Sequence, residues 1–197
     1  RYPIIVKPTD RSGSRGIYKL ETPEKLKEAV KDAISESFSK NALIEGFAEG
    51  QEYSVEFISY KGKHTFLQMT LKYTTGAPHF IETGHLEPAP VSKETLSKVK
   101  SVVSHALDSL GITNGASHSE LKIDADGNIN IIEIGGRMGG DLIGSDLVRY
   151  STGYDFVRMV IDVAVGSAPD FTKVCEPMPV KSVFIFTEED LRELNRL

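Results

Sequence analysis

The sequence predicts an α+β fold in which antiparallel sheets carry helices packed on them. Two observations lead to this class. Runs of β-type residues follow one another in pairs joined by short turns, as in "SVEFISYKGKHTFLQMTL" around Gly62, and this is hairpin chemistry. Segments with helical spacing stand between these pairs and do not alternate strictly with single strands. Together they favour antiparallel sheet over a regular βαβ arrangement.

Composition and charge narrow the function classes. The 197 residues suit one domain or two small lobes, and 40% hydrophobic and 26% charged residues are ordinary globular values. No stretch approaches the roughly 20 apolar residues that cross a bilayer. The net charge of −5 argues against a nucleic-acid polymer as partner. The sequence therefore predicts neither a membrane nor a polynucleotide partner, although a small anion can bind locally.

The single cysteine, Cys175, excludes an internal disulfide and favours a reducing compartment, the cytoplasm. The chain opens on "RYPIIVKP", without an initiator methionine and almost directly in a strand-like run. We therefore expect an excised piece of a longer protein, which lacks an upstream element and some site residues with it. A homodimer is compatible with the sequence.

The first half of the chain is expected to start with a buried strand over 3–7. A loop rich in glycine, serine and arginine follows over 8–17. A helix is predicted over 22–37, because Thr22 is a suitable N-cap and Pro23 suits the first helical position. Three β-type runs come next, over 42–47 and 52–74, the last two joined by "YKGK".

The second half begins with a proline-spaced segment over 76–90. A helix over 92–111 carries its apolar residues on one stripe and ends at Gly111. The remaining expected elements are a hairpin over 116–136, a helix over 154–166, a strand over 180–186 and a helix capped by the T-x-x-D pattern at Thr187.

The second hairpin, "SELKIDADGNINIIEIGGRMGGD", brings two glutamates together. If Asp126–Gly127 is the centre of a tight turn, Ala125 pairs with Asn128 and Glu120 pairs with Glu133. A three-residue turn shifts this register by one. In the favoured register the Cβ atoms of the glutamates lie roughly 5 Å apart on one face, and like charges so placed repel.

Such a pair has two physical resolutions. Either one carboxyl holds a proton with a raised pKa, or a cation lies between the two groups. Glutamate oxygens together with phosphate oxygens suit magnesium or manganese. The alternative is that Glu120 points to solvent and pairs with Lys122 or Lys72, a common arrangement on sheets. Both interpretations stay open at this point.

The loop "SGSRG" over 12–16 follows the first strand and has the chemistry of an anion site. Its glycines bring backbone N–H groups close to an anion, and Ser12, Ser14 and Arg15 add donors. The loop matches neither the P-loop nor the dinucleotide fingerprint, so a flexible hairpin tip is the alternative. Lys7 ends the preceding buried strand, and a buried lysine needs an anionic partner such as a phosphate.

The connector "LIEGFAEGQEYSVE" over 43–56 has features of a nucleoside site. Backbone groups of an extended segment, here Phe47 and Ala48, can bond an adenine edge. A carboxylate, here Glu45 or Glu52, can accept both hydroxyls of a ribose. Taken alone, the segment is also an ordinary strand, turn and strand.

Taken in order, these motifs resemble those of the ATP-grasp superfamily. The matched series is "IIVKP", "SGSRGI", "LIEGFAEGQEYSVE", "HSEL" and "IIEIGGRMGGD", and it covers nearly the whole chain. The resemblance is closest to ATP-dependent carboxylate–amine ligases, a group with amino-acid ligases, phosphoribosylamine–glycine ligase and the carbamoyl phosphate synthase large chain. It implies two lobes, over 1–48 and 49–197, that enclose a nucleotide site, with the family's N-terminal domain absent.

The resemblance also implies roles for individual residues, with ATP and Mg2+ (or Mn2+) as cofactors. Lys7 would contact the phosphates under a mobile lid formed by 12–16. Glu120 and Glu133 match the metal ligands, and Arg137 matches the arginine that steadies the acyl phosphate. Glu45 and the backbone of Phe47 and Ala48 would meet the adenine, and Glu52 the ribose. The implied ATP contacts are Lys7, Ser12, Ser14, Arg15, Gly16, Glu45, Phe47, Ala48, Glu52 and Leu121.

One position departs from the family pattern. Many members carry asparagine two residues after the second metal glutamate, where this chain has Gly135. Either water or Asp141 would replace that ligand, or the second metal ion would bind more weakly. For the substrates, Glu82 and His85 are candidate contacts because they lie between the sheet and the helix before the hairpin; a surface histidine is the alternative for His85. Gly136 and Asp141 complete the candidate substrate contacts.

The implied reaction joins a small-molecule carboxylate to an amine. The carboxylate attacks the γ-phosphate of ATP, and the amine captures the acyl phosphate. Positioning and charge neutralisation by the metal, Lys7 and Arg137 would supply most of the acceleration. The alternatives are a biotin-carboxylase-like carboxylase and a non-catalytic nucleotide-binding module, which Gly135 supports. With its upstream part missing, the chain alone need not catalyse the reaction.

Overall fold

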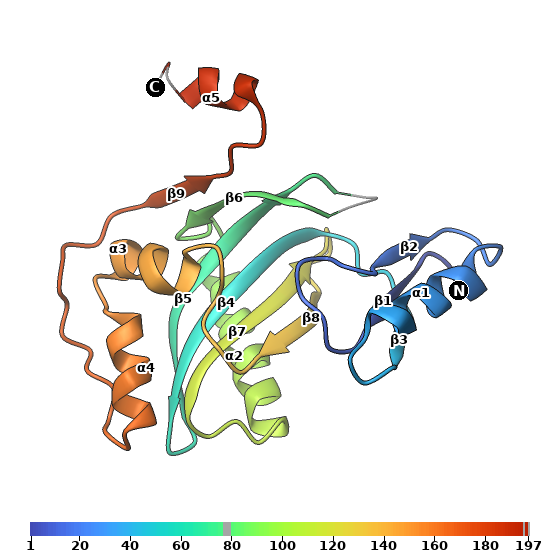
Figure 1. Cartoon of the computed structure of the whole chain (residues 1–197). Coiled ribbons are helices and arrows are strands. Elements are labelled where there is room, and N and C mark those ends of the chain that lie inside the picture. The colour runs from blue at the N-terminus through green and yellow to red at the C-terminus, as the bar shows by residue number, and fades with distance from the viewer. Residues whose placement is uncertain (77–79, 195, 197) are drawn as a thin grey trace. The chain divides into compact units, whose positions relative to one another are not determined.

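The computed structural model describes residues 1–76, 80–194 and 196 (Figure 1). The chain divides into two compact units, each with its own sheet and apolar core. The first unit holds Arg1–Glu49 and Thr74–Glu82, and the second holds Gly50–Tyr73 and Thr83–Leu197.

The first unit is a three-stranded antiparallel sheet with one helix. Its elements are β1 (Ile4–Pro8), β2 (Tyr18–Leu20), α1 (Leu26–Glu36) and β3 (Ala42–Gly46). β1 is central and pairs with β2 on one side and with β3 on the other. Val6 of β1 is completely buried in one cluster with Ala29 and Ala33 of α1. The strand over 3–7 and the strand over 42–47 were predicted, whereas β2 was not.

The first helix begins later than the sequence predicted. Its N-cap is Lys25, which makes no side-chain cap hydrogen bond, so the assignment of Thr22 as the cap is wrong. The amide of Leu26 bonds the carbonyl of Pro23 at 3.0 Å and closes a turn in front of the helix. Thr22 instead hydrogen-bonds Glu24 and lowers the pKa of that carboxyl.

The second unit is built on a six-stranded sheet in the order β8-β7-β4-β5-β6-β9. β4 pairs antiparallel with both β5 and β7. The predicted turn between β4 and β5 is formed by Lys61 and Gly62, which both have positive φ. The strands are β4 (Gln51–Tyr60), β5 (Lys63–Thr74), β6 (Glu82–Glu87), β7 (Gly115–Ile123), β8 (Ile129–Gly135) and β9 (Val180–Val183).

Helices of this unit begin and end close to the predicted ranges. Ser92 caps α2 and Asp155 caps α4 with side-chain oxygens, and Thr187 and Asp190 form the predicted reciprocal cap of α5. None of the helices over the described residues has the length and apolar character needed to cross a bilayer. The helices are α2 (Lys93–Ser109), a π-helical turn η1 (Ile143–Leu147), α3 (Val148–Thr152), α4 (Phe156–Ala164) and α5 (Glu188–Leu194).

One face of the six-stranded sheet carries an apolar cluster that packs against α2. Val99, Val103 and Leu107 of α2 are completely buried there. The sheet contributes residues with alternate spacing, as expected for one face of antiparallel strands. These sheet residues are Val55, Phe57, Met69 and Leu121.

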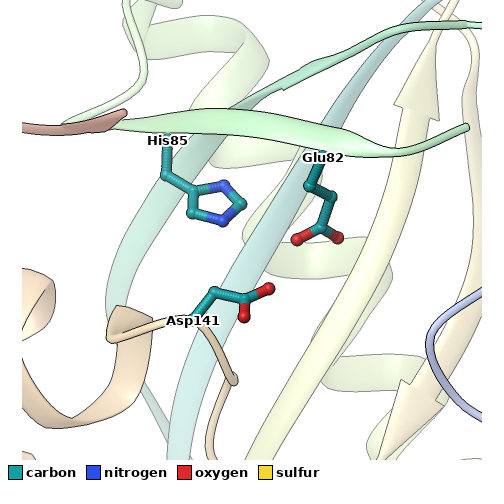
Figure 2. Close-up of side chains that lie close together, drawn as sticks. All are labelled: Glu82, His85 and Asp141. Atoms are coloured by element: carbon teal, nitrogen blue, oxygen red, sulfur yellow. The ribbon is translucent and has the colours of Figure 1, made fainter. Parts of the chain in front are cut away.

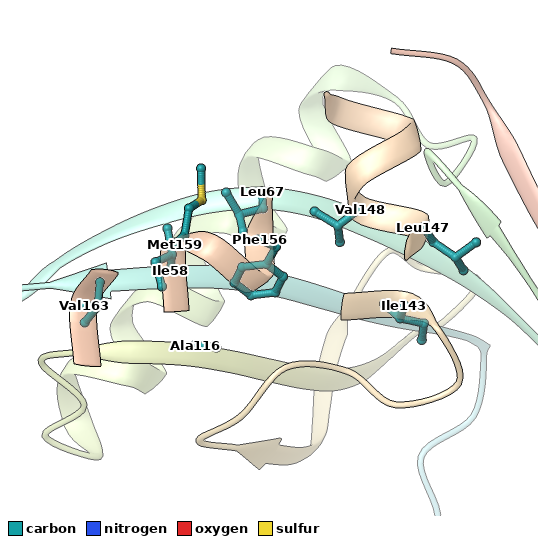
Figure 3. Packing of buried hydrophobic residues seen from close by; sticks show 9 residues of the cluster. All are labelled: Ile58, Leu67, Ala116, Ile143, Leu147, Val148, Phe156, Met159 and Val163. Carbon is teal, nitrogen blue, oxygen red and sulfur yellow. The ribbon is translucent and has the colours of Figure 1, made fainter. Parts of the chain in front are cut away.

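The opposite face is apolar over only part of its length. There Ile58 and Ala116 stand opposite each other and pack with Phe156 of α4 (Figure 3). Two residues away on each of the same strands, Glu56 of β4 stands opposite His118 of β7. Buried polar groups are costly unless they are paired, so this polar part of the face needs a set of mutual partners.

Three elements of the second unit had no prediction: β6, η1 and α3. β6 lies in the segment expected only to be spaced by prolines, of which 77–79 are outside the described residues. Its sequence "ETGHLE" has no β-branched alternation, and its pairing with the neighbouring strands β5 and β9 makes it a strand. A Cβ at Gly84 would lie 2.6 Å from the carbonyl oxygen of Ser182, so glycine permits this close pairing.

Candidate functional site

The hairpin of β7 and β8 has the predicted pair of glutamates but a different turn. Glu120 and Glu133 are partners in register, as the sequence predicted. At the turn, however, the amide of Asp124 bonds the carbonyl of Asn128 at 3.1 Å. The predicted pairing of Ala125 with Asn128 is therefore wrong, and the turn has three residues beyond the paired ones.

A bulge restores the register that the longer turn displaces. Leu121 faces Ile131, whereas the preceding Glu120 faces Glu133, so Ile132 is one extra residue on β8. Without this bulge, the three-residue turn would set the two carboxylates one position apart. The prediction is confirmed at the glutamates because two local irregularities compensate.

Cations of the chain itself neutralise Glu120. Its Oε1 lies 2.8 Å from Nζ of Lys72 and 3.3 Å from Nε2 of His118. Burial would raise the pKa of Glu120, but His118 and Lys72 outweigh it and lower that pKa to about 2. Lys72 was one of the two partners in the surface interpretation; it is nevertheless buried, with 2% of its surface exposed, so this is not a solvent-facing ion pair.

His118 links Glu120 to a second, fully buried glutamate. Its Nδ1 contacts Oε1 of Glu56, which has no exposed surface, and Oε2 of Glu56 accepts the N–H of Gly139 at 3.0 Å. Burial would lower the pKa of His118, but its hydrogen bonds to Glu120 and Glu56 raise it to about 9. The ring is thus cationic at neutral pH, and both nitrogens donate.

Lys72 extends this network to Glu52, the residue that the resemblance assigned to the ribose. The distance from Nζ of Lys72 to Oε1 of Glu52 is 3.2 Å, and Nζ of Lys122 lies 3.8 Å from Oε2. Leu121, also assigned to the nucleotide, is completely buried in the cluster under α2. Its neighbour Glu120 is on the opposite face of the strand.

Arg137 lies against the backbone of Gly135. A Cβ built on Gly135 would be 3.4 Å from Cγ and 3.7 Å from Cζ of Arg137, which is ordinary van der Waals contact, so the side chain of Arg137 packs closely on Gly135. Nη1 donates to the carbonyl of Met138 at 2.8 Å. Arg137 and Gly136 also line an open depression of about 780 Å³, bordered by the β4–β5 turn and by apolar residues of α4.

His85 and Asp141 point toward one another (Figure 2). A nitrogen of His85 and a carboxylate oxygen of Asp141 lie within 4.8 Å. His85 is completely buried, which rules out the surface-histidine alternative, and the ring of Phe184 stands edge-on at 5.5 Å. Glu82, the last residue of the first unit, opens the same strand β6.

The segment that carries Asp141 has an unusual backbone. Asp141 and Leu142 have φ of 50° and 66°, in the left-handed region that favours glycine. Such conformations cost about 1–3 kcal/mol each for other residues and cluster at functional sites. The glycines before them and the π-helical turn after them hold this segment against the polar part of the sheet.

In the first unit, Lys7 pairs with Glu45. Nζ of Lys7 lies 2.7 Å from Oε1 of Glu45, across the β1–β3 pair. The anionic partner that the burial of Lys7 requires is therefore supplied in part by the chain. The structure thus joins two residues that the resemblance assigned to the phosphates and to the adenine.

The 12–16 loop exposes its hydroxyl side chains. Ser12 and Ser14 are exposed, and Gly13, Ser14 and Gly16 have positive φ. Nε of Arg15 donates to the carbonyl of Ser12 at 3.2 Å, so the loop closes on itself.

The predicted adenine contacts follow β3. The amide of Phe47 donates to the carbonyl of Pro3 at 3.1 Å. The ammonium of Lys19 lies 4.3 Å from the centre of the Phe47 ring. Ala48 is half-buried.

The sequence interpretation missed the roles of Glu56 and His118 and treated Lys72 only as an alternative. A signal for Glu56 was present, because it is a lone glutamate inside the apolar run "SVEFIS", as Glu133 is in its own strand. For His118, the spacing of two from Glu120 puts both side chains on one face of a strand. Which residues they meet depends on the register with β4, and a hairpin-level argument does not give that register.

The comparison with known families decides the recognition. Residues 1–146 match the family described as "ATP-grasp domain". The chain belongs to the ATP-grasp family. The recognition made from the ordered motifs is thereby confirmed.

The relatives of this ATP-grasp domain are named as ligases. D-alanine–D-alanine ligase of Mannheimia succiniciproducens is 28% identical over 177 residues, which are 84% of this chain and 54% of that protein. Alanine–anticapsin ligase of Bacillus subtilis is 25% identical over 182 residues, which are 82% of this chain and 38% of that protein. The chain spans about half the length of the curated relatives it matches, or less.

Solved structures support the ATP-grasp fold. The L-amino acid ligase from Bacillus licheniformis has a TM-score of 0.72 at 30% identity, over 83% of this chain and 39% of that one. Biotin carboxylase from Campylobacter jejuni has a TM-score of 0.74 at 20% identity, over 86% and 38%, and this likeness shows the fold alone. The predicted α+β class with antiparallel sheets is confirmed.

Proposed function

We propose that this ATP-grasp domain serves an ATP-dependent carboxylate–amine ligase. A carboxylate oxygen attacks the γ-phosphorus of ATP and ADP leaves; the amine then attacks the acyl carbon, phosphate leaves and a C–N bond forms. The observation that carries the proposal is the opposed pair Glu120 and Glu133, within the family match of a chain whose relatives are named as ligases.

The hairpin residues fit a magnesium or manganese ion. Glu120 is ionised, and its contacts with Lys72 and His118 both use Oε1. Glu133 is exposed and stands directly opposite. Two carboxylates so placed, together with phosphate oxygens, are ligands that magnesium prefers. When bound, the ion would neutralise charge on the β- and γ-phosphates.

Other residues of the second unit are assigned by their positions around this pair. Arg137 is proposed to steady the acyl phosphate and the tetrahedral species that follows it, because it follows β8 and folds back onto Gly135, two residues after Glu133. Glu52 is proposed to bind the ribose. Leu121 is also proposed as a nucleotide contact, because it directly follows Glu120 in β7.

The first unit is proposed to supply the remaining ATP contacts. Lys7 would bind the phosphates, and Glu45 with the backbone of Phe47 and Ala48 would bind the adenine. In support, the ammonium of Lys7 is held in place by Glu45. The 12–16 loop, with Ser12, Ser14, Arg15 and Gly16, would cover the phosphates. We propose that the two units are the two ATP-grasp lobes predicted over 1–48 and 49–197.

Amino acids are the substrate class that the relatives' names favour. His85 and Asp141 are proposed to contact the substrate, because they approach each other from two separate segments of the second unit. Glu82, which opens the strand that carries His85, and Gly136, which follows β8, belong to the same proposal. A cytoplasmic location completes it, because the sequence has a single cysteine.

The test uses the protein as its gene encodes it, with MgATP and a panel of amino acids and other carboxylates. We expect release of ADP and phosphate that requires both a carboxylate and an amine, with the amide product found by mass spectrometry. MgATP at 100 times its dissociation constant should stabilise the protein by about 2.7 kcal/mol. The absence of this thermal shift would contradict the proposal.

Two further arms sharpen this test. Arg137→Ala should retain the thermal shift with MgATP and lose at least about 100-fold in ADP release, as for loss of one charge-stabilising group. Bicarbonate with biotin replaces the amino acids in the other arm. Turnover in that arm alone would identify a carboxylase and contradict the ligase proposal.

A further inference from the structure

Glu56 is a buried carboxylate with both oxygens in use. It lies within β4 and has no exposed surface. One oxygen contacts Nδ1 of His118, and the other accepts the N–H of Gly139 at 3.0 Å. Because the side chain does not reach solvent, Glu56 acts on other groups of the protein.

The contact with Gly139 fixes the segment that follows Arg137. A Cβ at Gly139 would lie 2.8 Å from Oε1 of Glu56, 2.9 Å from Nδ1 of His118 and 3.0 Å from Cβ of Ile143. A Cβ at Gly144 would lie 2.5 Å from Cβ of Met138. Real Cβ atoms do not approach this closely, so glycine at 139 and 144 is needed for the segment to rest on Glu56.

The contact with His118 leads to the proposed metal ligand. Nε2 of His118 lies 3.3 Å from Oε1 of Glu120, which Lys72 also approaches. Glu56 therefore reaches Glu120 through one intervening residue, His118, and it bonds Gly139, which follows Arg137 by two residues. Charge-assisted hydrogen bonds in a buried setting are stronger than neutral ones and fix geometry.

We propose that Glu56 is a positioning residue for the ligase reaction, which holds Glu120 through His118 and the Arg137 segment through the amide of Gly139. The inference rests on the proposed function. Through this one carboxylate, the proposed metal ligand and the proposed acyl-phosphate contact keep a fixed relation. Its loss should lower turnover far more than the binding of ATP.

The test compares Glu56→Gln with Glu87→Gln in the full protein. Glu56→Gln keeps the volume and an acceptor for Gly139 but removes the charge that faces His118. Glu87 is a matched control, because it is also fully buried in the second unit and its oxygens accept hydrogen bonds from the hydroxyls of Thr70 and Ser151. We expect kcat per folded molecule to fall at least about 10-fold for Glu56→Gln, as in a loss of positioning, with KM for ATP nearly unchanged. For Glu87→Gln we expect kcat within about twofold.

A double-variant cycle asks whether Glu56 acts through the Gly139 segment. Gly139→Ala alone should also lower kcat about 10-fold, and the double variant should lose little more than either single one, because residues that act as a unit are not additive. If the loss of kcat in the double variant equals the product of the two single losses, the proposal is wrong. Gly140→Ala is the control, since a Cβ at Gly140 meets nothing within 4 Å.

Backbone NMR supplies a readout that does not need turnover. The amide signal of Gly139 should shift and exchange faster in Glu56→Gln and keep its wild-type values in Glu87→Gln. An unchanged Gly139 signal, or an unchanged kcat in Glu56→Gln, overturns the role of Glu56 while leaving the ligase intact. If Glu56→Gln does not fold, Gly139→Ala decides. A wild-type protein without carboxylate-dependent ADP release overturns the ligase proposal instead.

Discussion

Two glutamates of the second unit show how buried partners set charge. Glu120 lies beside Lys72 and His118, and its pKa is lowered to about 2 despite burial. Glu87 is also buried, but its partners are the hydroxyls of Thr70 and Ser151. Burial raises the pKa of Glu87 to about 7, and these hydrogen bonds only partly oppose the rise.

The difference teaches that a glutamate inside a strand is no evidence of charge by itself. Around β4 and β7, ammonium and imidazolium groups keep a carboxylate ionised and suitable for a cation. Around β5 and β6, hydroxyl groups satisfy a carboxyl that is about half protonated near neutral pH. The first arrangement favours chemistry, whereas the second joins β5, β6 and α3.

The largest effect is expected from removing Lys72, the cation that lies between Glu52 and Glu120. Lys72→Met leaves Glu52 and Glu120 without the ammonium that both contact. Breaking a buried ion pair typically costs about 3–5 kcal/mol, and we expect a loss of about 4 kcal/mol in the free energy of unfolding. Urea denaturation measures it. The control is Lys98→Met, which removes an exposed pair on α2 and should change stability by less than about 1 kcal/mol.

The raised pKa of Glu87 should make the free energy of unfolding depend on pH. Because the pKa of Glu87 is raised from 4.5 to about 7 in the folded state, its favourable contribution is complete below pH 4.5 and is lost as the pH rises through about 7. A shift of this size corresponds to about 3 kcal/mol. Glu87→Gln should therefore gain about this much relative to the wild type between pH 4.5 and 8. The assignment would be contradicted if the free energies of unfolding of Glu87→Gln and of the wild type changed in parallel across this pH range.

An intermediate effect is expected at Gly139, which lies against Glu56. Gly139→Ala places a methyl group 2.8 Å from Oε1 of Glu56, and overpacking of this kind costs about 1–3 kcal/mol. Thermal unfolding should show a loss of about 2 kcal/mol. Gly140→Ala, which meets no atom within 4 Å, should stay close to the wild type; equal losses in both variants would mean that Glu56 is not the cause.

The smallest effect is expected from removing the hydroxyl of Ser151, which bonds Glu87. Ser151 donates to Oε2 of Glu87 at 2.8 Å, and a hydrogen bond to the charged form lowers a pKa. Ser151→Ala should raise the pKa of Glu87 further and cost about 1 kcal/mol at alkaline pH. Titration of the Glu87 carboxyl carbon by NMR gives the pKa directly. A downward shift would contradict the role given to this hydroxyl.

Local patterns predicted much of the fold. Hairpin chemistry at Gly62, the helical stripe that ends at Gly111 and the cap at Thr187 all appear as expected. These features depend on residues close in sequence, so a short window contains their cause. β6 was missed because "ETGHLE" has no strand pattern of its own, and its strand character comes from its place between β5 and β9 in the sheet.

The candidate site shows the same division. The opposition of Glu120 and Glu133 was predicted from a tight turn, but it results from a longer turn compensated by a bulge at Ile132. The pairing of Lys7 with Glu45 was not predicted, since it depends on the register of two strands separated by a helix.

The sequence by itself determined the family, the class of fold and the residue types that suit a nucleotide and a metal ion, because ordered motifs and periodic patterns are local properties. Only the tertiary structure decided which of these carboxylates are charged. The charge of Glu120 and the near-neutral pKa of Glu87 depend on partners from other strands and helices. Electrostatic interaction falls with distance and rises with burial, and the folded chain fixes both.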